Sequence, residues 1–160
     1  MANLRRATPA DAAALTALRG LMHEAMGSPP TPEWAEVCEA AIARRLATDT
    51  FAGFVVEDGG RVVSGGVGWL EEHLPSPFQL DPRRGHIGSM STEPSARRRG
   101  HGRAVLAALM GWFVEQGVPR VDLRATPDGQ ALYEEFGFRA LGGATMAWSA
   151  PGTRAGMPGR

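Results

Sequence analysis

Residues 85–117 read GHIGSMSTEPSARRRGHGRAVLAALMGWFVEQG, and this stretch decides the fold. Its first part, residues 85–92, predicts a strand, and an arginine-rich turn with proline and glycine follows. From residue 99 to about residue 116, apolar side chains recur at helical spacing: Val105, Leu106, Leu109, Trp112 and Phe113. A further strand is predicted at residues 121–125. We therefore expect a right-handed strand–helix–strand crossover with parallel strands.

The segments on either side of this crossover complete a mixed sheet with helices on both faces. Two helices that begin at Thr-Pro pairs and a hairpin with an Asp-Gly-Gly turn are predicted before it. A third Thr-Pro helix start and two short strands are predicted after it. The expected ranges are residues 8–26 and 31–46 for the first helices, 51–57 and 61–70 for the hairpin, 126–137 for the last helix, and 138–141 and 144–149 for the last strands.

The composition suits one globular domain. The chain has 160 residues, and we expect a single domain over residues 1–150 with a tail at residues 151–160. Its 17 basic residues, all of them Arg, balance 17 acidic ones, which argues against nucleic acid as the main partner. The single cysteine, Cys38, cannot form an internal disulfide. No stretch is long and apolar enough to cross a membrane, and no metal-ligand spacing is visible, so we expect a cytoplasmic protein without a metal site.

The turn before the long helix has the properties of an anion site. At the start of a helix, N–H groups without intrahelical partners point outward together with the positive end of the helix dipole. Gly100 and Gly102 carry no Cβ, so a phosphate can approach the backbone there. The neighbouring arginines can add charge-assisted hydrogen bonds; they are Arg97, Arg98, Arg99 and Arg103. The alternative for the same residues is an exposed turn with solvated arginines.

Two motifs in this part of the chain lie at the spacing of a known family. Arg97, Gly100 and Gly102 match the pattern R/Q-x-x-G-x-G/A between a strand and a helix. Residues 133–138, YEEFGF, match the pattern Y-x-x-x-G-F on a later helix. With both motifs in this order, the chain resembles the GNAT superfamily of acetyl-CoA-dependent N-acetyltransferases. The resemblance covers residues 51–148 well and the two opening helices loosely.

The resemblance implies a fold, an activity and a co-substrate. The fold is mixed α/β: a central, mostly antiparallel twisted sheet of six to seven strands, splayed at the cofactor site, with about four helices on its two faces. The activity is direct transfer of the acetyl group of acetyl-CoA to a primary amine of a small molecule or a protein. Members of the family often pair through sheet edges or terminal strands, so a homodimer is also expected.

The resemblance also implies roles for individual residues. The Tyr133 hydroxyl would donate a proton to the departing CoA sulfur, and a backbone N–H near Met90 or Ser91 would hold the oxyanion. His101 would cap or shield the phosphates, and Thr126 stands where many members have Asn. The expected cofactor site consists of Met90, Ser91, Thr92, Arg97, Arg98, Arg99, Gly100, His101, Gly102, Arg103, Thr126 and Tyr133.

A base is also required, because an amine acceptor arrives mostly as an ammonium ion. The family supplies this base from varied positions, often through water. Four side chains near predicted strand ends are candidates: Glu71, Glu72, His73 and His86. The alternative for each is an ordinary solvated side chain.

Three other functions match parts of the same pattern. A dinucleotide-binding enzyme would use Gly100, Gly102 and Asp122, but Val105 stands at the third glycine of G-x-G-x-x-G and only one crossover is predicted. A non-catalytic acyl-CoA-binding sensor or interaction module of the same fold is compatible with both motifs, although Tyr133 argues for catalysis. An RNA contact through the arginine-rich turn lacks interleaved aromatic residues.

Overall fold

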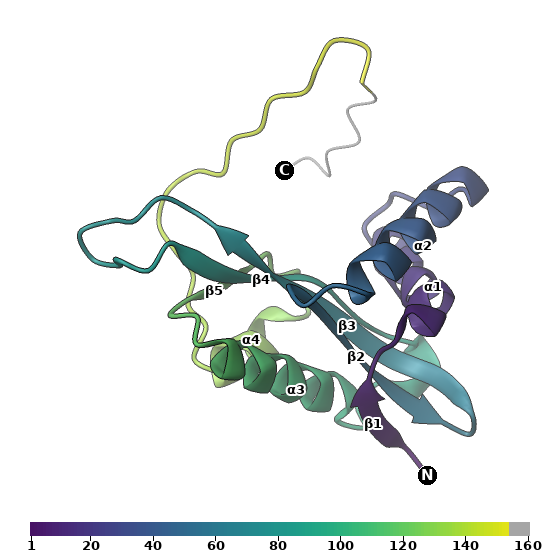
Figure 1. Ribbon diagram of the computed structural model, residues 1–160. Coiled ribbons are helices and arrows are strands. Elements are labelled where there is room, and N and C mark those ends of the chain that lie inside the picture. Colours follow the sequence, from purple (N-terminus) through teal and green to yellow (C-terminus); the bar gives the residue numbers. More distant parts are fainter. Residues whose placement is uncertain (154–160) are drawn as a thin grey trace.

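Residues 1–153, which this computed structural model describes, form one mixed sheet with helices on both faces (Figure 1). The strands are β1 (Asn3–Arg6), β2 (Phe51–Asp58), β3 (Arg61–Glu72), β4 (Arg83–Thr92) and β5 (Val121–Leu123). The α-helices are α1 (Ala12–Ala25), α2 (Pro32–Leu46), α3 (His101–Gln116) and α4 (Gln130–Glu135), and 3-10 turns at Pro9–Asp11 and Pro94–Ala96 precede α1 and α3. None of the helices in this described part has the length and apolar character that crossing a membrane requires.

The strands lie in the spatial order β1-β2-β3-β4-β5. The pairs from β1 to β4 are antiparallel, and Gly59 and Gly60 join β2 to β3 with φ angles of 59° and 77°, as a tight hairpin turn requires. After α3 the chain returns to the sheet, and β5 pairs with β4 in parallel, with Gly85 opposite Val121. The predicted hairpin and parallel crossover are therefore confirmed, and the fold is the mixed α/β fold expected from the motifs.

The sheet separates two hydrophobic cores. The helices α1 and α2 lie on one face, and α3 and α4 lie on the other (Figure 1). On the first face, Leu15 and Ile42 pack in one cluster with Val55. On the second face, Leu106 and Phe113 of α3 are almost completely buried. Each helix layer thus buries its apolar stripe against the sheet.

The helix α3 lies so close to the sheet that glycine is needed on β3 and β4. A Cβ at Gly68 would lie 2.7 Å from a ring atom of Phe113, and a Cβ at Gly85 would lie 2.5 Å from the same ring. Both distances are far below van der Waals contact, so a larger residue would push α3 outward. This packing explains why β4 has few large aliphatic residues although it is a central strand.

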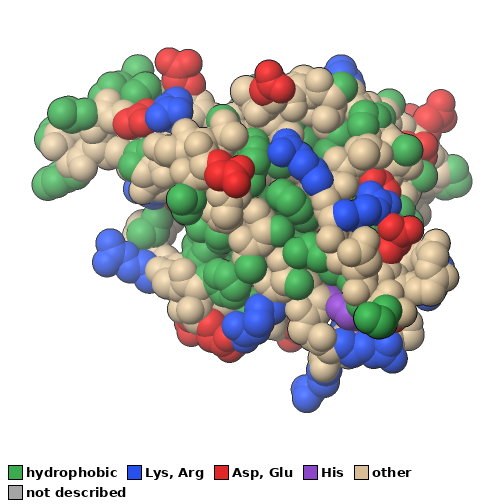
Figure 2. Space-filling model, turned by 60° about the horizontal axis from the view of Figure 1, so that its bottom comes forward, with side chains coloured by type: hydrophobic (Ala, Val, Ile, Leu, Met, Phe, Trp, Pro, Cys, Tyr) green, Lys and Arg blue, Asp and Glu red, His purple; other side chains and the backbone are tan. Residues whose placement is uncertain are grey.

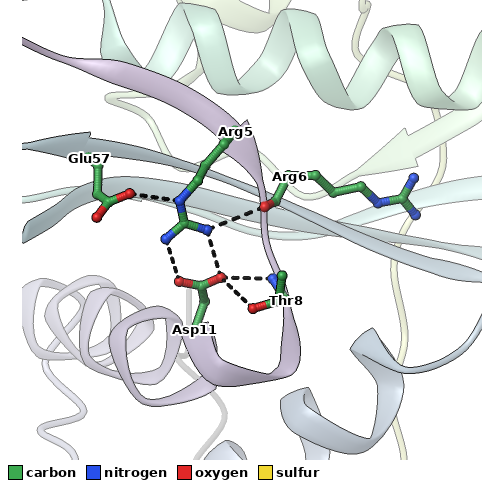
Figure 3. A network of polar contacts seen from close by, with 5 residues as sticks. All are labelled: Arg5, Arg6, Thr8, Asp11 and Glu57. Carbon is green, nitrogen blue, oxygen red and sulfur yellow. Dashed lines mark hydrogen bonds and ion pairs between the residues drawn. The ribbon is translucent and has the colours of Figure 1, made fainter.

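A polar network fixes the start of α1 to β1 and β2 (Figure 3). The Arg5 guanidinium donates to both carboxylate oxygens of Asp11, at 2.8 and 2.9 Å, and to Glu57 at 2.7 Å. Asp11 also accepts a hydrogen bond of 2.7 Å from the Thr8 backbone N–H. The hydrogen bonds from Arg5 hold the pKa of Asp11 below its ordinary value, although burial acts in the opposite direction.

The last part of the chain differs from the sequence prediction. The predicted strands at residues 138–141 and 144–149 are not formed, so the described sheet has five strands rather than six to seven. A strand requires a neighbouring strand, whereas the side chains of residues 139–153 are all exposed and the segment leads away from the sheet (Figure 1). The rest of the predicted tail, residues 154–160, lies outside the described residues.

The helix predicted from residue 8 begins with the 3-10 turn Pro9–Asp11 and becomes α-helical at Ala12. Two other helices also begin later than their sequence patterns predict. The helix α3 begins at His101 rather than at residue 99, because Gly100 has a left-handed conformation with φ 78°. The helix α4 begins at Gln130 rather than at Thr126. The Thr126 carbonyl accepts hydrogen bonds from the N–H groups of Gly129 and Gln130, so the predicted helix start is a separate turn. Both differences arise beside glycine, which has low helix propensity.

Replacing Asp11 with Asn is expected to lower the free energy of unfolding by about 2 kcal/mol at neutral pH, because charge-assisted hydrogen bonds at a helix start are lost. In the wild-type protein this stabilisation is present above the ordinary carboxyl pKa of about 4. It is lost as the pH falls through the lowered pKa of folded Asp11. Urea denaturation of both proteins should therefore show a difference in the free energy of unfolding at neutral pH that disappears in acid.

Asp81→Asn provides the matched control. Asp81 pairs with Arg83 at 2.8 Å in an exposed position, where solvent screens such a pair and it contributes little to stability. If Asp11→Asn cost no more than Asp81→Asn, or if its cost did not change with pH, the network in Figure 3 would not anchor α1.

Candidate active site

The strand β4 has neighbours on both sides only over its first half. It pairs with β3 as far as Thr92, but it pairs with β5 only at residues 85–87. Along residues 88–92, β3 is therefore the only strand beside β4 in the described part of the chain. We call residues 88–92 the free edge of β4.

A β-bulge lies where the free edge begins. Pairing between β3 and β4 passes from Gly68–Ile87 to Val67–Ser89, which leaves Gly88 as an additional residue of β4. A bulge of this kind bends its strand, and the inserted residue shifts by one position the alternation of the backbone groups that follow it. The bulge at Gly88 thus accompanies the separation of β4 from β5.

Two side chains from other elements contact this bulge. Trp69 of β3 lies against Gly88 so closely that a Cβ there would be 2.0 Å from the indole ring. Arg19 of α1 donates a hydrogen bond of 2.8 Å to the Gly88 carbonyl oxygen. The sequence patterns do not single out Arg19. Its only signal in the sequence is an arginine within the apolar stripe of α1, beside Leu18 and Met22.

The backbone groups of the free edge alternate in direction. The Glu93 N–H donates to the Val63 carbonyl on the β3 side, at 2.8 Å. Because successive residues of a strand direct their N–H and C=O groups to opposite sides, Ser91 also faces β3, whereas Met90 and Thr92 face the open side. Of the three residues expected to line the cofactor site here, Met90 and Thr92 therefore present backbone groups to it.

Side-chain contacts agree with this alternation. The Ser64 hydroxyl of β3 donates to the Ser91 carbonyl at 3.3 Å. The Thr92 carbonyl instead accepts a hydrogen bond of 3.3 Å from the Arg97 guanidinium. The free edge is thus linked directly to the arginine-rich turn that follows it.

The turn before α3 presents a row of free donors. Arg98 and Gly100 both have left-handed backbone conformations, with φ angles of 61° and 78°. The first intrahelical hydrogen bond runs from Ala104 to Gly100, at 3.0 Å, so the N–H groups of residues 101–103 have no intrahelical acceptor. No side chain caps this end of the helix. The arrangement suits an anion.

The side chains around this turn carry further donors. The four arginines at positions 97, 98, 99 and 103 are all exposed. On the face that carries α3, Figure 2 shows a histidine beside arginine side chains. His101 is half-buried, and its Nε2 atom is buried without a hydrogen-bond partner among the described residues. A buried nitrogen without a partner at an anion site fits a phosphate oxygen as the missing acceptor.

The helix α4 is held against the first turn of α3. Arg103 forms an ion pair with Glu135 and lies 6.0 Å from the centre of the Phe136 ring. A Cβ on Gly102 would be 3.9 Å from the Leu132 side chain, in ordinary contact. These contacts place α4 on the same side of the sheet as the arginine-rich turn before α3.

Tyr133 lies on α4 and is half-buried. Its ring packs edge-on against Phe138, with ring centres 5.9 Å apart. Burial raises the pKa of the Tyr133 hydroxyl above its ordinary value, so it keeps its proton at neutral pH. Thr126 is half-buried in the turn before α4, beside Gly129. The chemistry available to Tyr133 is proton donation.

Three of the four candidate bases lie together. The Glu71 carboxylate accepts hydrogen bonds from Trp69 Nε1 at 2.9 Å and from His73 Nε2 at 3.0 Å. His86 is half-buried and lies beside Trp69, with ring centres 4.9 Å apart. Burial alone would raise the pKa of Glu71, but the two hydrogen bonds and the nearby histidines hold it below its ordinary value. Glu71 is therefore a weak base whose oxygens already have donors.

Glu72 lies apart from this group. Side chains alternate along a strand, so Glu72 is on the opposite face of β3 from Glu71, and it is exposed. The other three candidates share the α1 and α2 face of the sheet with Arg19. Within residues 1–153, no group of three or more His, Cys, Asp and Glu side chains is placed to hold a metal ion.

The sequence matches the model of the acetyltransferase (GNAT) family over residues 18–138. No curated protein matches the chain. Several hundred solved chains share its fold. One is described as a predicted acetyltransferase with acetyl-CoA from Clostridium acetobutylicum: the TM-score is 0.83 at 21% sequence identity, with 92% of this chain and 96% of that chain covered.

Two further solved structures are similar over nearly the whole chain. A GCN5-related N-acetyltransferase from Ralstonia eutropha JMP134 has a TM-score of 0.80 at 25% identity, with 92% of this chain and 99% of that chain covered. An aminoglycoside N-acetyltransferase in complex with CoA has a TM-score of 0.73 at 16% identity, with 93% and 95% covered. The family match covers most of the chain and includes the free edge of β4, the turn before α3 and Tyr133. The protein therefore belongs to the GNAT acetyltransferase family, which uses acetyl-CoA as its co-substrate.

Proposed function

We propose that the protein transfers the acetyl group of acetyl-CoA directly to a primary amine. The observation that carries this proposal is the continuity of the free edge of β4 with the anion-binding turn, through the hydrogen bond from Arg97 to Thr92. An extended molecule with amides at one end and phosphates at the other would match both parts at once. Acetyl-CoA has this form, and it supplies an activated thioester.

The turn before α3 would hold the pyrophosphate. The free N–H groups of residues 101–103 and the buried His101 Nε2 supply donors there. The exposed arginines at positions 97, 98, 99 and 103 add positive charge, and Gly100 leaves the backbone accessible. Thr126, half-buried before α4, completes the cofactor side of the proposed site.

The residues of the chain would assist three events at the thioester. The Met90 N–H, which faces the open side of β4, would hold the carbonyl oxygen as negative charge develops on it. The amine nitrogen forms a bond to the carbonyl carbon, the carbon–sulfur bond breaks, and the nitrogen loses its extra proton to water. Tyr133 would donate its proton to the departing sulfur, for which its raised pKa keeps it protonated. The tyrosinate would regain a proton from solvent.

His86 is the best placed of the candidate bases. Glu71 already accepts two hydrogen bonds, and Glu72 lies on the other face of the sheet. His86 lies on β4 two residues before the bulge at Gly88, and a neutral imidazole nitrogen can accept a proton. We propose that it removes the proton from the ammonium form of the acceptor, directly or through water.

The acceptor is proposed to be a primary amine of a small molecule or of a protein. Among the proteins of similar structure are aminoglycoside N-acetyltransferases. Polyamine substrates of this kind, single amines and peptide amino termini therefore form the first set of acceptors to screen.

Calorimetric titration with acetyl-CoA is expected to show micromolar binding that Gly100→Glu abolishes. The substitution places a bulky negative group among the donors that would hold the pyrophosphate. Gly117→Glu is the matched control, because Gly117 ends the same helix with a similar φ of 70° and open surroundings.

The control shows whether a loss of acetyl-CoA binding in Gly100→Glu comes from backbone strain or from disruption of the proposed anion site. Both variants place the same residue in a left-handed conformation, but only one is at the helix start. Loss of binding in both variants would indicate a general effect of strain. No binding by folded wild-type protein would exclude the acetyltransferase proposal itself.

Tyr133→Phe is expected to lower kcat about 100-fold while leaving the affinity for acetyl-CoA unchanged, because it removes only the proton donor. The wild-type rate should also fall at high pH as Tyr133 loses its proton, above the ordinary tyrosine pKa because burial raises it. The release of CoA thiol with an acceptor from the screen measures both effects. If Tyr133→Phe keeps the wild-type rate and pH profile, Tyr133 is not the acid.

We further propose a homodimer in which residues 144–149 of one protomer extend the sheet of the other beyond β5. In this segment Met146 and Trp148 lie two residues apart, so they would share one face of a strand, and they are 89% and 82% exposed. The strand β5 pairs only with β4 within the described chain, so its outer edge can accept a further strand.

Light scattering on the purified chain should give the mass of a dimer, whereas Trp148→Glu should give a monomer because its charge opposes burial. Val37→Glu is the control, since Val37 is an exposed side chain of α2, 66% accessible. A wild-type monomer at micromolar concentration would contradict this arrangement.

A further inference from the structure

We infer that Arg19 is a positioning residue for the oxyanion site: it fixes the bulge at Gly88 and supplies positive charge beside the Met90 N–H. This inference rests on the acetyltransferase function proposed above. Its basis is the hydrogen bond of 2.8 Å from the Arg19 guanidinium to the Gly88 carbonyl, which joins residues 69 positions apart in the sequence.

The Gly88 carbonyl lies next to the group that would stabilise the oxyanion. Gly88 and Met90 are two residues apart on the same strand, so their α-carbons are separated by roughly 6–7 Å. Ser89 directs its N–H to β3, as Ser91 does, so the Gly88 carbonyl of the same planar peptide unit points to the open side, where the Met90 backbone groups also lie. A thioester oxygen bound by the Met90 N–H would therefore approach the negative end of the Gly88 carbonyl dipole.

Arg19 changes the sign of the electrostatic field at this point. Without a donor, the Gly88 carbonyl oxygen would repel a developing oxyanion. The guanidinium bound to it places a full positive charge there. None of the ion pairs formed by the described residues includes Arg19, so its charge is not offset by a contacting carboxylate.

Arg19 also limits which backbone groups remain free. The flanking carbonyls of the free edge each accept a hydrogen bond from an arginine: Gly88 from Arg19, and Thr92 from Arg97. The Met90 groups lie between these two contacts. Arg19 and Arg97 thus border the part of β4 that is left open to a substrate chain.

The position of Arg19 is itself well defined. It lies on the sheet-facing side of α1, next to the buried residues Leu15 and Leu18. The Leu15 and Leu18 side chains lie close above Gly65 of β3, where a Cβ would be 2.8 and 3.3 Å from them. The helix is thus seated on the sheet next to β4, and Trp69 covers the bulge from β3. A carbonyl held between these contacts has little freedom to reorient.

The test compares Arg19→Met and Arg19→Lys with wild-type protein. The first removes the charge and the donor, and the second keeps a charge and a donor on a shorter chain. Infrared difference spectra of bound, carbonyl-labelled acetyl-CoA report the polarisation of the thioester carbonyl and need no acceptor. We expect the carbonyl stretch to fall in frequency on binding to wild type, to fall much less in Arg19→Met, and to be largely restored in Arg19→Lys.

Kinetics with an acceptor from the amine screen give the second readout. Arg19→Met should lower kcat about tenfold, less than the hundredfold or more that follows removal of an oxyanion donor itself. The KM for acetyl-CoA and its calorimetric affinity should stay within about twofold of wild type, because an effect on the transition state leaves ground-state binding unchanged. Arg44→Met, which removes an exposed arginine of α2, is the control for the loss of one charge.

The outcomes separate this inference from the function on which it rests. If wild-type protein neither binds nor turns over acetyl-CoA, the proposed function fails first. If wild type is active and Arg19→Met keeps its carbonyl frequency and kcat, only the role of Arg19 is overturned. A change confined to KM, or an equal loss in Arg44→Met, would also overturn it. If Arg19→Met does not fold, the spectrum and kcat of Arg19→Lys test the inference. A carbonyl frequency in Arg19→Lys equal to that of free acetyl-CoA would contradict it.

Discussion

The free edge of β4 is the constraint on which the rest of the site depends. Backbone N–H and C=O groups that lose water without gaining a partner cost about 1–3 kcal/mol each, so a central strand is normally paired on both sides. Here β5 leaves β4 after Ile87 while β3 continues alongside as far as Thr92. The donors and acceptors that this separation exposes can be satisfied by an extended ligand. Recognition by backbone places few demands on side-chain identity, which is compatible with the polar side chains of Ser89, Ser91 and Thr92 at this edge.

Close packing on both faces of the sheet keeps this edge in place. Phe113 of α3 presses on Gly68 and Gly85 from one face, and Trp69 covers Gly88. Because protein interiors have few voids, these contacts leave the strands little room to move. The gap between β4 and β5 therefore stays open. The same contacts explain why glycines, which usually weaken strands, are concentrated in the two central ones.

For binding an anion, the local arrangement of charge in this protein matters more than its net charge. The formal net charge is zero, yet arginines gather at the turn before α3 and at the bulge. Arg103 is paired with Glu135 and Arg99 lies near Asp58, so part of this charge supports neighbouring elements. The donors that remain for a bound anion are the backbone N–H groups, His101 Nε2 and the exposed arginine side chains.

The sequence by itself determined most of the elements and the position of the glycine- and arginine-rich turn before α3. Helical spacing from Val105 to Phe113, the Asp58-Gly59-Gly60 turn and the glycines at the start of α3 are local signals, and each depends on residues that are neighbours in the chain. The parallel crossover followed from these elements, because strand–helix–strand connections between parallel strands of one sheet are almost always right-handed. Local patterns overpredicted the last two strands, since a strand exists only where another strand can pair with it.

Only the tertiary structure decided which side chains meet. The contact of Arg19 with Gly88 joins α1 to β4, and no local pattern distinguishes this arginine from one exposed to solvent. The hydrogen bonds that hold Glu71 ionised, and the alternation that turns Met90 rather than Ser91 to the open side, depend on strand register and on the bulge. Register and side-chain partners arise from packing between distant segments, so they are set by the folded core and not by the spacing of residues along the chain.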